Sequence, residues 1–175
     1  MRRIISVFLL LAASLGMSAQ TLPTDPETKK ITYQETVNMD SLSKAQLYER
    51  CKNWMTNYYK STKFDLDDKV NKITTSGYFI VTLTYDFKYK SEYNVSYTIA
   101  FNLKEGKYRY TITDFAVYKV ATGLKTIQPA ETAYAKMTTA NKKEFVMQVT
   151  AEINKLIADM KVAIKSGKMK DQDDW

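Results

Sequence analysis

Few side chains suited to covalent chemistry occur in this 175-residue sequence, which contains no histidine and one cysteine. Without histidine, neither a Ser-His-Asp nor a Cys-His arrangement can form, and a histidine-ligated zinc site is excluded. Cys51 could act as a nucleophile, but it falls on the apolar side of a predicted helix. We therefore interpret Cys51 as a buried structural thiol and expect no catalytic residue and no enzyme activity.

Two other short motifs suggest chemistry and are better explained by structure. The segment Ser41–Lys44 has the Ser-x-x-Lys spacing of penicillin-recognising enzymes, but their companion motifs are absent, and helix capping explains its serines. Asp65, Asp67 and Asp68 could offer oxygens to calcium, yet calcium sites use roughly six to eight oxygens with glycine-assisted turns. The glycines are too far apart to form a phosphate-binding loop. We expect no metal and no cofactor.

Two helices are predicted from apolar residues at spacings of three and four. The first covers about residues 44–59, and Ser43 and Gln46 form a capping box at its start. The second begins near Asn141, where Asn141 and Glu144 resemble a capping box, and stops at Gly167.

Strands are predicted where apolar and polar residues alternate, over 31–39, 64–66, 72–89, 93–103 and the segment after Gly106. In the long segment 72–89, Tyr78 and Ile80 are apolar exceptions on the polar side, and Gly77 suggests a bulge or bend. The segment 119–138 has no clear period, although a short helix over 129–137 is one option.

A two-residue hairpin turn is predicted at Glu105-Gly106, because Gly106 can adopt a positive φ. This turn fixes the pairing of the strands on either side of it. The predicted pairs are Leu103 with Tyr108, Phe101 with Tyr110, Ile99 with Ile112, Asn102 with Arg109, and Thr98 with Thr113.

The element order is strand, helix, four strands, helix. Because each strand has one apolar face, this order predicts an α+β fold with an antiparallel five-stranded sheet and both helices packed on one face.

The first nineteen residues indicate export. Arg2 and Arg3 precede an apolar run over 4–15, and Met17-Ser18-Ala19 supplies small residues, which is the pattern of a secretory signal peptide. The apolar run is shorter than the roughly 20 residues of a spanning helix, so we expect cleavage after Ala19 and no membrane span afterwards. The protein would then be periplasmic or extracellular.

The rest of the chain is consistent with one domain. We expect a signal peptide over 1–19, a flexible leader over 20–30, a single α+β domain over 31–166 and a charged tail over 167–175. The full-length net charge is +7, but its basic residues are mixed with acidic ones along the chain. This distribution favours a solvated surface and no nucleic-acid partner.

Certain residues resemble a family of exported proteins from Gram-negative anaerobes, described as a domain of unknown function with a TBP-like fold. They are Leu47–Arg50 and Trp54 in the first helix, Lys72-Ile73 at the start of the long strand, and Gly106–Tyr110 after the hairpin turn. The resemblance covers about residues 31–118 and implies the TBP-like fold. It implies no catalytic residues and no DNA binding.

These features favour an exported, non-catalytic binding or adaptor module whose partner is an envelope protein or a glycan. One alternative is a carrier that holds a small apolar ligand between the sheet and the last helix, with 119–138 as its lid. A weaker alternative is a hydrolase that uses carboxylates such as Asp86, Glu92 or Asp114, which would have to be paired in a cleft.

The candidate binding surface is the face of the sheet that the two helices leave uncovered. Short hydroxyl side chains around one basic group are suited to directional hydrogen bonds, with Arg109 as the strongest single contact. The candidate residues are Thr82, Thr84, Ser96, Thr98, Arg109, Thr111 and Thr113.

Overall fold

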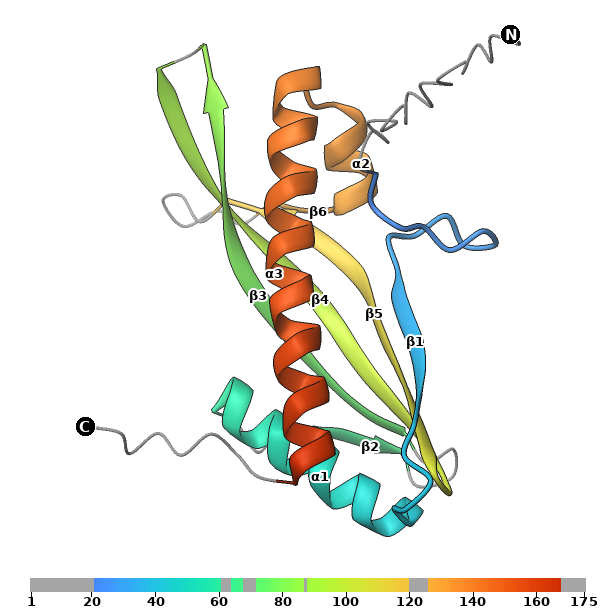
Figure 1. Cartoon of the computed structure of the whole chain (residues 1–175). Coiled ribbons are helices and arrows are strands. Elements are labelled where there is room, and N and C mark those ends of the chain that lie inside the picture. Colours follow the sequence, from blue (N-terminus) through green and yellow to red (C-terminus); the bar gives the residue numbers. More distant parts are fainter. Residues whose placement is uncertain (1–20, 61–63, 68–71, 87, 120–125, 168–175) are drawn as a thin grey trace, which may run out of the picture.

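The computed structural model of the chain describes residues 21–60, 64–67, 72–86, 88–119 and 126–167 (Figure 1). The strands are β1 (Tyr33–Asn38), β2 (Asp65–Asp67), β3 (Lys72–Tyr85), β4 (Tyr89–Lys104), β5 (Lys107–Tyr118) and β6 (Ile127–Pro129). The helices are α1 (Lys44–Tyr59), α2 (Ala130–Ala135) and α3 (Thr139–Ser166). The predicted signal peptide and cleavage site lie outside the described residues.

The strands form one antiparallel sheet in the order β1-β5-β4-β3-β2, and β6 pairs with the C-terminal end of β5, at residues 116–118. This arrangement confirms the predicted α+β class and the five strands that were expected. The sixth strand, β6, and helix α2 both fall in the segment 119–138, for which a short helix over 129–137 was the one element considered. Residues 120–125 of that segment lie outside the described part of the chain.

The β4–β5 hairpin has the predicted register. Gly106 adopts a φ of +68°, and all five predicted pairs are observed, from Leu103 with Tyr108 at the turn to Thr98 with Thr113. The turn and the alternation of apolar residues specify the same pairing, so each strand presents its apolar side chains to the core.

The preceding hairpin was predicted less accurately. Strand β3 ends at Tyr85 and does not continue to residue 89, and β4 begins at Tyr89, four residues before the predicted start of its alternation. The turn between them contains Asp86 at a φ of +48°, and the N–H of Lys88 donates to the carbonyl of Tyr85 at 3.1 Å. Aspartate tolerates this left-handed conformation and so permits the turn.

A β-bulge in β5 changes which residues face the core. The β4–β5 register shifts between Ser96 and Thr98, and Asp114 on the opposite strand has a φ of +53°. Before the bulge Ile112 is buried, whereas after it Phe115 is buried, so the core-facing side changes from even to odd numbers. The Asp114 carboxylate accepts an ion-paired hydrogen bond from the Lys30 ammonium at 2.6 Å.

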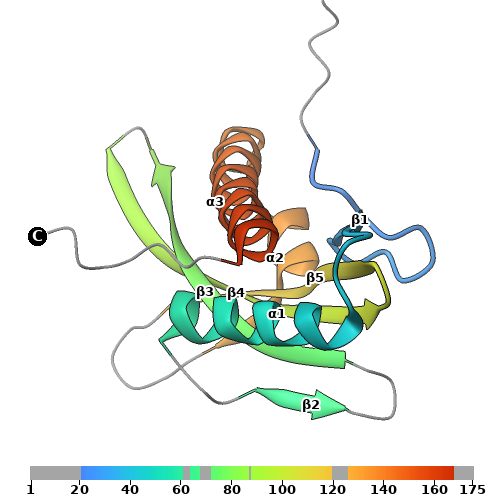
Figure 2. The ribbon, with the colours of Figure 1, turned by 60° about the horizontal axis from the view of Figure 1, so that its bottom comes forward.

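Both long helices pack on the same face of the sheet, as predicted. Their buried residues, including Leu47 of α1 and Leu156 of α3, belong to one hydrophobic core with the inward side chains of the strands. Figure 1 shows α3 running lengthwise over the sheet, and Figure 2 shows α1 on the same side. The Arg50 guanidinium donates to the last carbonyls of α3, on Ile164 (2.9 Å) and Lys165 (2.8 Å).

The two helix starts differ in how well they were predicted. At α1, Ser43 and Gln46 form the expected capping box, with bonds of 3.2 and 2.9 Å. The predicted box of Asn141 and Glu144 is wrong, because α3 begins earlier and Thr138 is its N-cap, accepting from the Asn141 N–H at 3.3 Å.

Residues 21–31 form a turn that packs on the domain. A flexible leader was expected over 20–30. The Asp25 carboxylate accepts a hydrogen bond from the N–H of Thr28 at 2.7 Å, and Thr24 and Ile31 form an isolated antiparallel β-bridge. Leu22 and Ile31 are buried in the core, so the domain extends further toward the N-terminus than residue 31. Among the described residues, no helix is long and apolar enough to cross a membrane.

Candidate functional site

The reactive side chains considered from sequence occupy structural or separate positions. Cys51 is fully buried, and burial raises the pKa of its thiol. Of the three carboxylates in the hydrolase hypothesis, Asp86 lies in the β3–β4 turn, Glu92 lies on β4, and Asp114 pairs with Lys30 at the β5 bulge. All three are exposed, and no pair of them is directly opposite across the sheet.

The predicted binding residues lie on the uncovered face but do not form one continuous patch. Thr98 and Thr113 are directly paired, and Thr111 lies two residues farther along β5, opposite Ala100. Arg109 is exposed near one end of the sheet, where it pairs with Asn102 of β4, which in turn pairs with Lys72 of β3. Thr82 is ten residues beyond Lys72, or about 33 Å along an extended strand, so Thr82 and Thr84 are remote from Arg109.

Several hydroxyl groups of this surface already have partners within the chain. Thr111 donates to the Gln34 side chain at 3.1 Å, Thr113 donates to the Ile31 carbonyl at 3.3 Å, and Ser96 donates to the Ala116 carbonyl at 3.4 Å. These bonds reduce what the hydroxyls can offer to a ligand.

The edge of β3 that faces away from β4 presents a different set of polar groups. The N–H groups of Thr82 and Thr84 point away from β4, because they donate to side chains of α3. In an antiparallel strand the N–H and C=O groups of alternate residues point to the same side. Those of Ser76, Tyr78 and Ile80 must therefore point outward as well, and we call these three residues the open β3 edge.

Both ends of β3 are covered along this side. At one end β2 pairs with β3 as far as Thr74. At the other end the Gln148 side chain accepts from the Thr82 N–H (2.9 Å) and donates to the Thr82 carbonyl (2.7 Å), while Glu144 accepts from the Thr84 N–H (2.8 Å). Between them, the described residues supply no hydrogen-bond partner to the open β3 edge.

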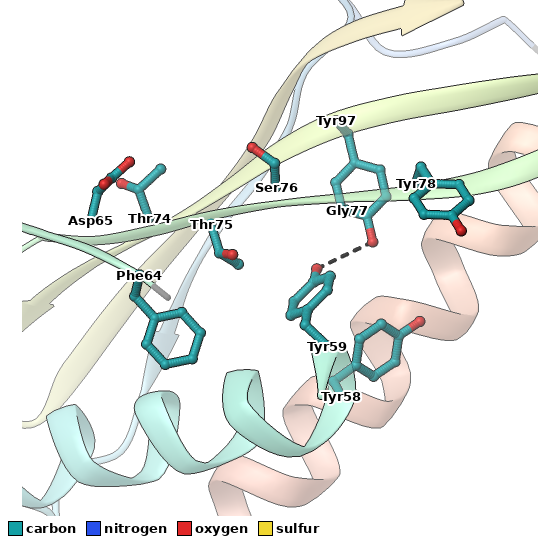
Figure 3. A pocket seen from close by; sticks show the side chains of 10 residues that line it. All are labelled: Tyr58, Tyr59, Phe64, Asp65, Thr74, Thr75, Ser76, Gly77, Tyr78 and Tyr97. Atoms are coloured by element: carbon teal, nitrogen blue, oxygen red, sulfur yellow. Dashed lines mark hydrogen bonds between the residues drawn. The ribbon is translucent and has the colours of Figure 1, made fainter. Parts of the chain in front are cut away.

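A cavity of about 870 Å³ adjoins the open β3 edge and is partly open to solvent (Figure 3). The consecutive residues Thr74–Tyr78 all line it, although their side chains alternate between the two faces of the sheet, so the cavity touches the edge of the strand itself. We call it the aromatic cavity. Its other lining residues are Tyr58, Tyr59, Phe64, Asp65 and Tyr97.

Gly77 makes room for the rings at the base of this cavity. It pairs with Tyr97 without any shift of the β3–β4 register, so of the two features suggested at Gly77, a bulge or a bend, the bulge is wrong. A Cβ atom at Gly77 would lie 2.6 Å from both the Tyr97 hydroxyl oxygen and the Tyr59 Cε1 atom. The hydroxyls of Tyr59 and Tyr97 are 3.2 Å apart and hydrogen-bonded, and burial raises the pKa of Tyr97 to about 12.

Two residues of the sequence point to this site. Tyr78 and Ile80 are apolar residues on the polar side of a strand, and they are 65% and 53% exposed. Exposed apolar side chains beside unpaired main-chain groups are a common property of strands that bind other chains.

Comparison with known proteins identifies the family. The family described as a domain of unknown function (DUF4468) with a TBP-like fold matches residues 33–118. Residues 33–118 belong to this family. The family match runs from β1 to the end of β5, so it includes the open β3 edge but not α3.

Solved structures support the same fold. The crystal structure of a TBP-like protein from Parabacteroides distasonis ATCC 8503 has a TM-score of 0.62 and 16% identity, over 82% of this chain and 97% of that chain. The crystal structure of a DUF4468 family protein from Bacteroides ovatus ATCC 8483 has a TM-score of 0.63 and 16% identity, over 89% and 95%. No curated protein matches the chain. These similarities confirm the predicted TBP-like fold.

Proposed function

We propose that this protein is an exported, non-catalytic binding module that captures an extended segment of another protein along the open β3 edge. The observation that carries the proposal is the row of outward main-chain groups at Ser76, Tyr78 and Ile80 beside the aromatic cavity. An added strand would bond to these groups, and its alternate side chains would reach the cavity and the exposed Tyr78 and Ile80. Export is supported by the pattern of the first nineteen residues.

The edge is a better candidate than the uncovered sheet face. On that face Ser96, Thr111 and Thr113 already hydrogen-bond within the chain. The apolar-carrier alternative also receives no support where it was placed, because Val149, Ile153 and Leu156 of α3 are buried in the core against the sheet. The aromatic cavity lies instead beside the C-terminal end of α1.

Replacement of Ile80 by proline tests the proposal. Proline removes the outward N–H, and an edge strand tolerates it where the N–H does not face a neighbouring strand. The control Ile80→Thr keeps the N–H and a β-branched side chain. A displayed library of random linear peptides is selected on the wild-type protein, and the binding of the selected peptides is measured by fluorescence anisotropy. We expect I80P to weaken binding about tenfold or more and I80T to have little effect, with similar melting temperatures.

Backbone methylation of a selected peptide supplies an independent readout. Methyl groups on alternate amide nitrogens should abolish binding, and methyl groups on the intervening ones should be tolerated, because only one set of N–H groups faces β3. If I80P binds the selected peptides like the wild type, or if no peptide prefers the wild type over I80P, the proposal is overturned.

A further inference from the structure

The aromatic cavity has the composition of a site for a cation. The rings of Tyr58, Tyr59, Phe64 and Tyr97 line it, whereas the exposed Asp65 side chain lies beside Thr74 on the other side of β3 (Figure 3). The faces of aromatic rings attract ammonium and guanidinium groups, and a neighbouring carboxylate adds to that attraction. An uncharged apolar side chain would gain nothing from such a carboxylate.

Two carboxylates of α3 add negative charge near the rim of the aromatic cavity. Burial is the main cause that raises the pKa of Tyr58, and the charges of Asp159 and Glu152 raise it further. Glu152 acts in the same direction on Tyr97. Asp159 is held in place by the indole N–H of Trp54 at 2.9 Å, whereas Glu152 is exposed.

The position of Glu152 follows from the periodicity of α3. Glu144 and Gln148 bind the N–H groups of Thr84 and Thr82, and Glu152 comes one further step of four residues along the same side of the helix. This step carries it along β3 from Thr82 toward the open β3 edge. Its carboxylate is thus on the side of α3 that faces an added strand.

We propose that the aromatic cavity binds an arginine or lysine side chain of the captured segment, with the aromatic rings around its aliphatic stem and charge and with Glu152 as the counter-ion. This specificity rests on the proposed function, because the captured strand delivers the basic side chain. The ligand class is therefore an extended polypeptide with a basic residue at the position that faces the cavity.

The test uses blocked nine-residue peptides of alternating serine and valine, in which one residue X is arginine, lysine, norleucine or glutamate. X is placed at each of two adjacent central positions, because alternate side chains of a strand point to opposite faces. At one of these positions we expect the arginine and lysine peptides to bind about tenfold more tightly than the norleucine peptide, and the glutamate peptide to bind most weakly.

Replacement of one carboxylate identifies its contribution. Glu152→Gln should weaken binding of the arginine peptide about threefold and leave the norleucine peptide unchanged. The control is Glu49→Gln, which changes the net charge equally at an exposed position on α1. If E49Q has the same effect as E152Q, the preference comes from the overall charge and the proposal is overturned.

The outcomes separate this inference from the function on which it rests. If norleucine binds as tightly as arginine at both positions, and I80P still abolishes binding, strand capture stands and the basic specificity is wrong. If no peptide of this series or of the selected library binds the wild-type protein in an Ile80-dependent way, both proposals are wrong.

Discussion

Gly77 leaves the space in which the rings of Tyr59 and Tyr97 meet. Glycine is usually explained in a strand by a bulge or an unusual backbone conformation, but Gly77 is in regular register and is not among the positive-φ glycines. The requirement is steric, because a methyl group there would lie 2.6 Å from a ring carbon of Tyr59 and 2.6 Å from the hydroxyl oxygen of Tyr97. The ring from the neighbouring strand thus occupies the volume that a side chain at residue 77 would fill.

Replacement of Gly77 by alanine is expected to destabilise the domain by about 1–3 kcal/mol, since the rings must move apart and lose their hydrogen bond. Urea unfolding monitored by tyrosine and tryptophan fluorescence measures the loss. Ser76→Ala is the matched control, because Ser76 is exposed on the opposite face, and it should change stability by less than about 0.5 kcal/mol. Equal effects of the two substitutions would show that the ring contact is unimportant.

The residues that carried the family resemblance have structural roles. Arg50 donates to the carbonyls at the end of α3, and the Trp54 indole donates to Asp159 of α3. Tyr108 and Tyr110, after the hairpin turn, are buried in the core. These contacts explain why the motif indicated the fold and gave no direct indication of a ligand.

At the scale of the elements, α3 replaces a missing neighbouring strand along part of β3. The Gln148 amide both accepts from and donates to the main chain of Thr82, as a residue of an added strand would. Four residues of helix rise about 6 Å and two residues of strand about 6.7 Å, so side chains four apart on α3 can match alternate residues of β3. This match holds for Glu144 and Gln148 and leaves residues 76–80 open.

Replacement of Gln148 by leucine removes both bonds to Thr82, and we expect the free energy of unfolding to fall by about 1–3 kcal/mol, because Thr82 is half-buried. Hydrogen exchange of the Thr82 amide should accelerate by more than the loss of overall stability alone would cause. Met147→Leu, at the adjacent exposed position, is the control and should leave both measurements nearly unchanged. Unaltered exchange at Thr82 in Q148L would contradict the role of this side chain.

Local patterns allowed most elements to be predicted, and non-local contacts account for the errors. The β4–β5 register depends on a two-residue turn and on alternation within adjacent strands, so it was predictable. The predicted start of α3 was wrong because Glu144 does not cap the helix. Its carboxylate accepts a hydrogen bond from the N–H of Thr84, 60 residues away. The bulge at Asp114 corresponds in the sequence to a change of the apolar residues from even positions to the odd positions of Phe115 and Val117.

At the scale of the whole molecule, Glu35 joins the first strand, the fifth strand and the last helix. Its carboxylate accepts from the Lys161 ammonium at 2.6 Å and from the Tyr110 hydroxyl at 2.8 Å. These two bonds, that of Lys161 first, hold the pKa of Glu35 below its usual 4.5. Because the folded pKa is below the unfolded one, the stabilisation is complete above about pH 4.5 and is lost as the pH falls through the folded value.

We therefore expect Glu35→Gln to lower the free energy of unfolding at pH 7 by less than about 1 kcal/mol, since the pair is half-exposed. The difference from the wild type should shrink as the pH is lowered from 4.5 toward 3, as measured by urea unfolding at several pH values. Glu92→Gln, at an exposed position with no ion pair among the described residues, is the control. A difference that is the same at every pH would refute the ionic origin of the effect.

The candidate site depends on the assembled molecule, which is why the sequence suggested a different surface. Alternation within a strand identifies an uncovered face, and it led to the hydroxyl residues around Arg109. It does not reveal where β2 stops or which part of β3 is bound by α3. The open edge and the aromatic cavity exist only between these elements, so Tyr78 and Ile80 were recognised as exceptions and not as a site.

The bonds between β3 and α3 also determine when, during synthesis, the edge of β3 is protected from pairing with another chain. Thr82 and Thr84 obtain their partners from residues 66 and 60 positions later. Because a ribosome makes the chain from its N-terminus, the whole outer side of β3 beyond β2 stays uncovered until the C-terminal helix has been made. During that interval the β3 edges of two nascent chains could pair with each other. Binding of a chaperone, or rapid completion of α3, would prevent this pairing.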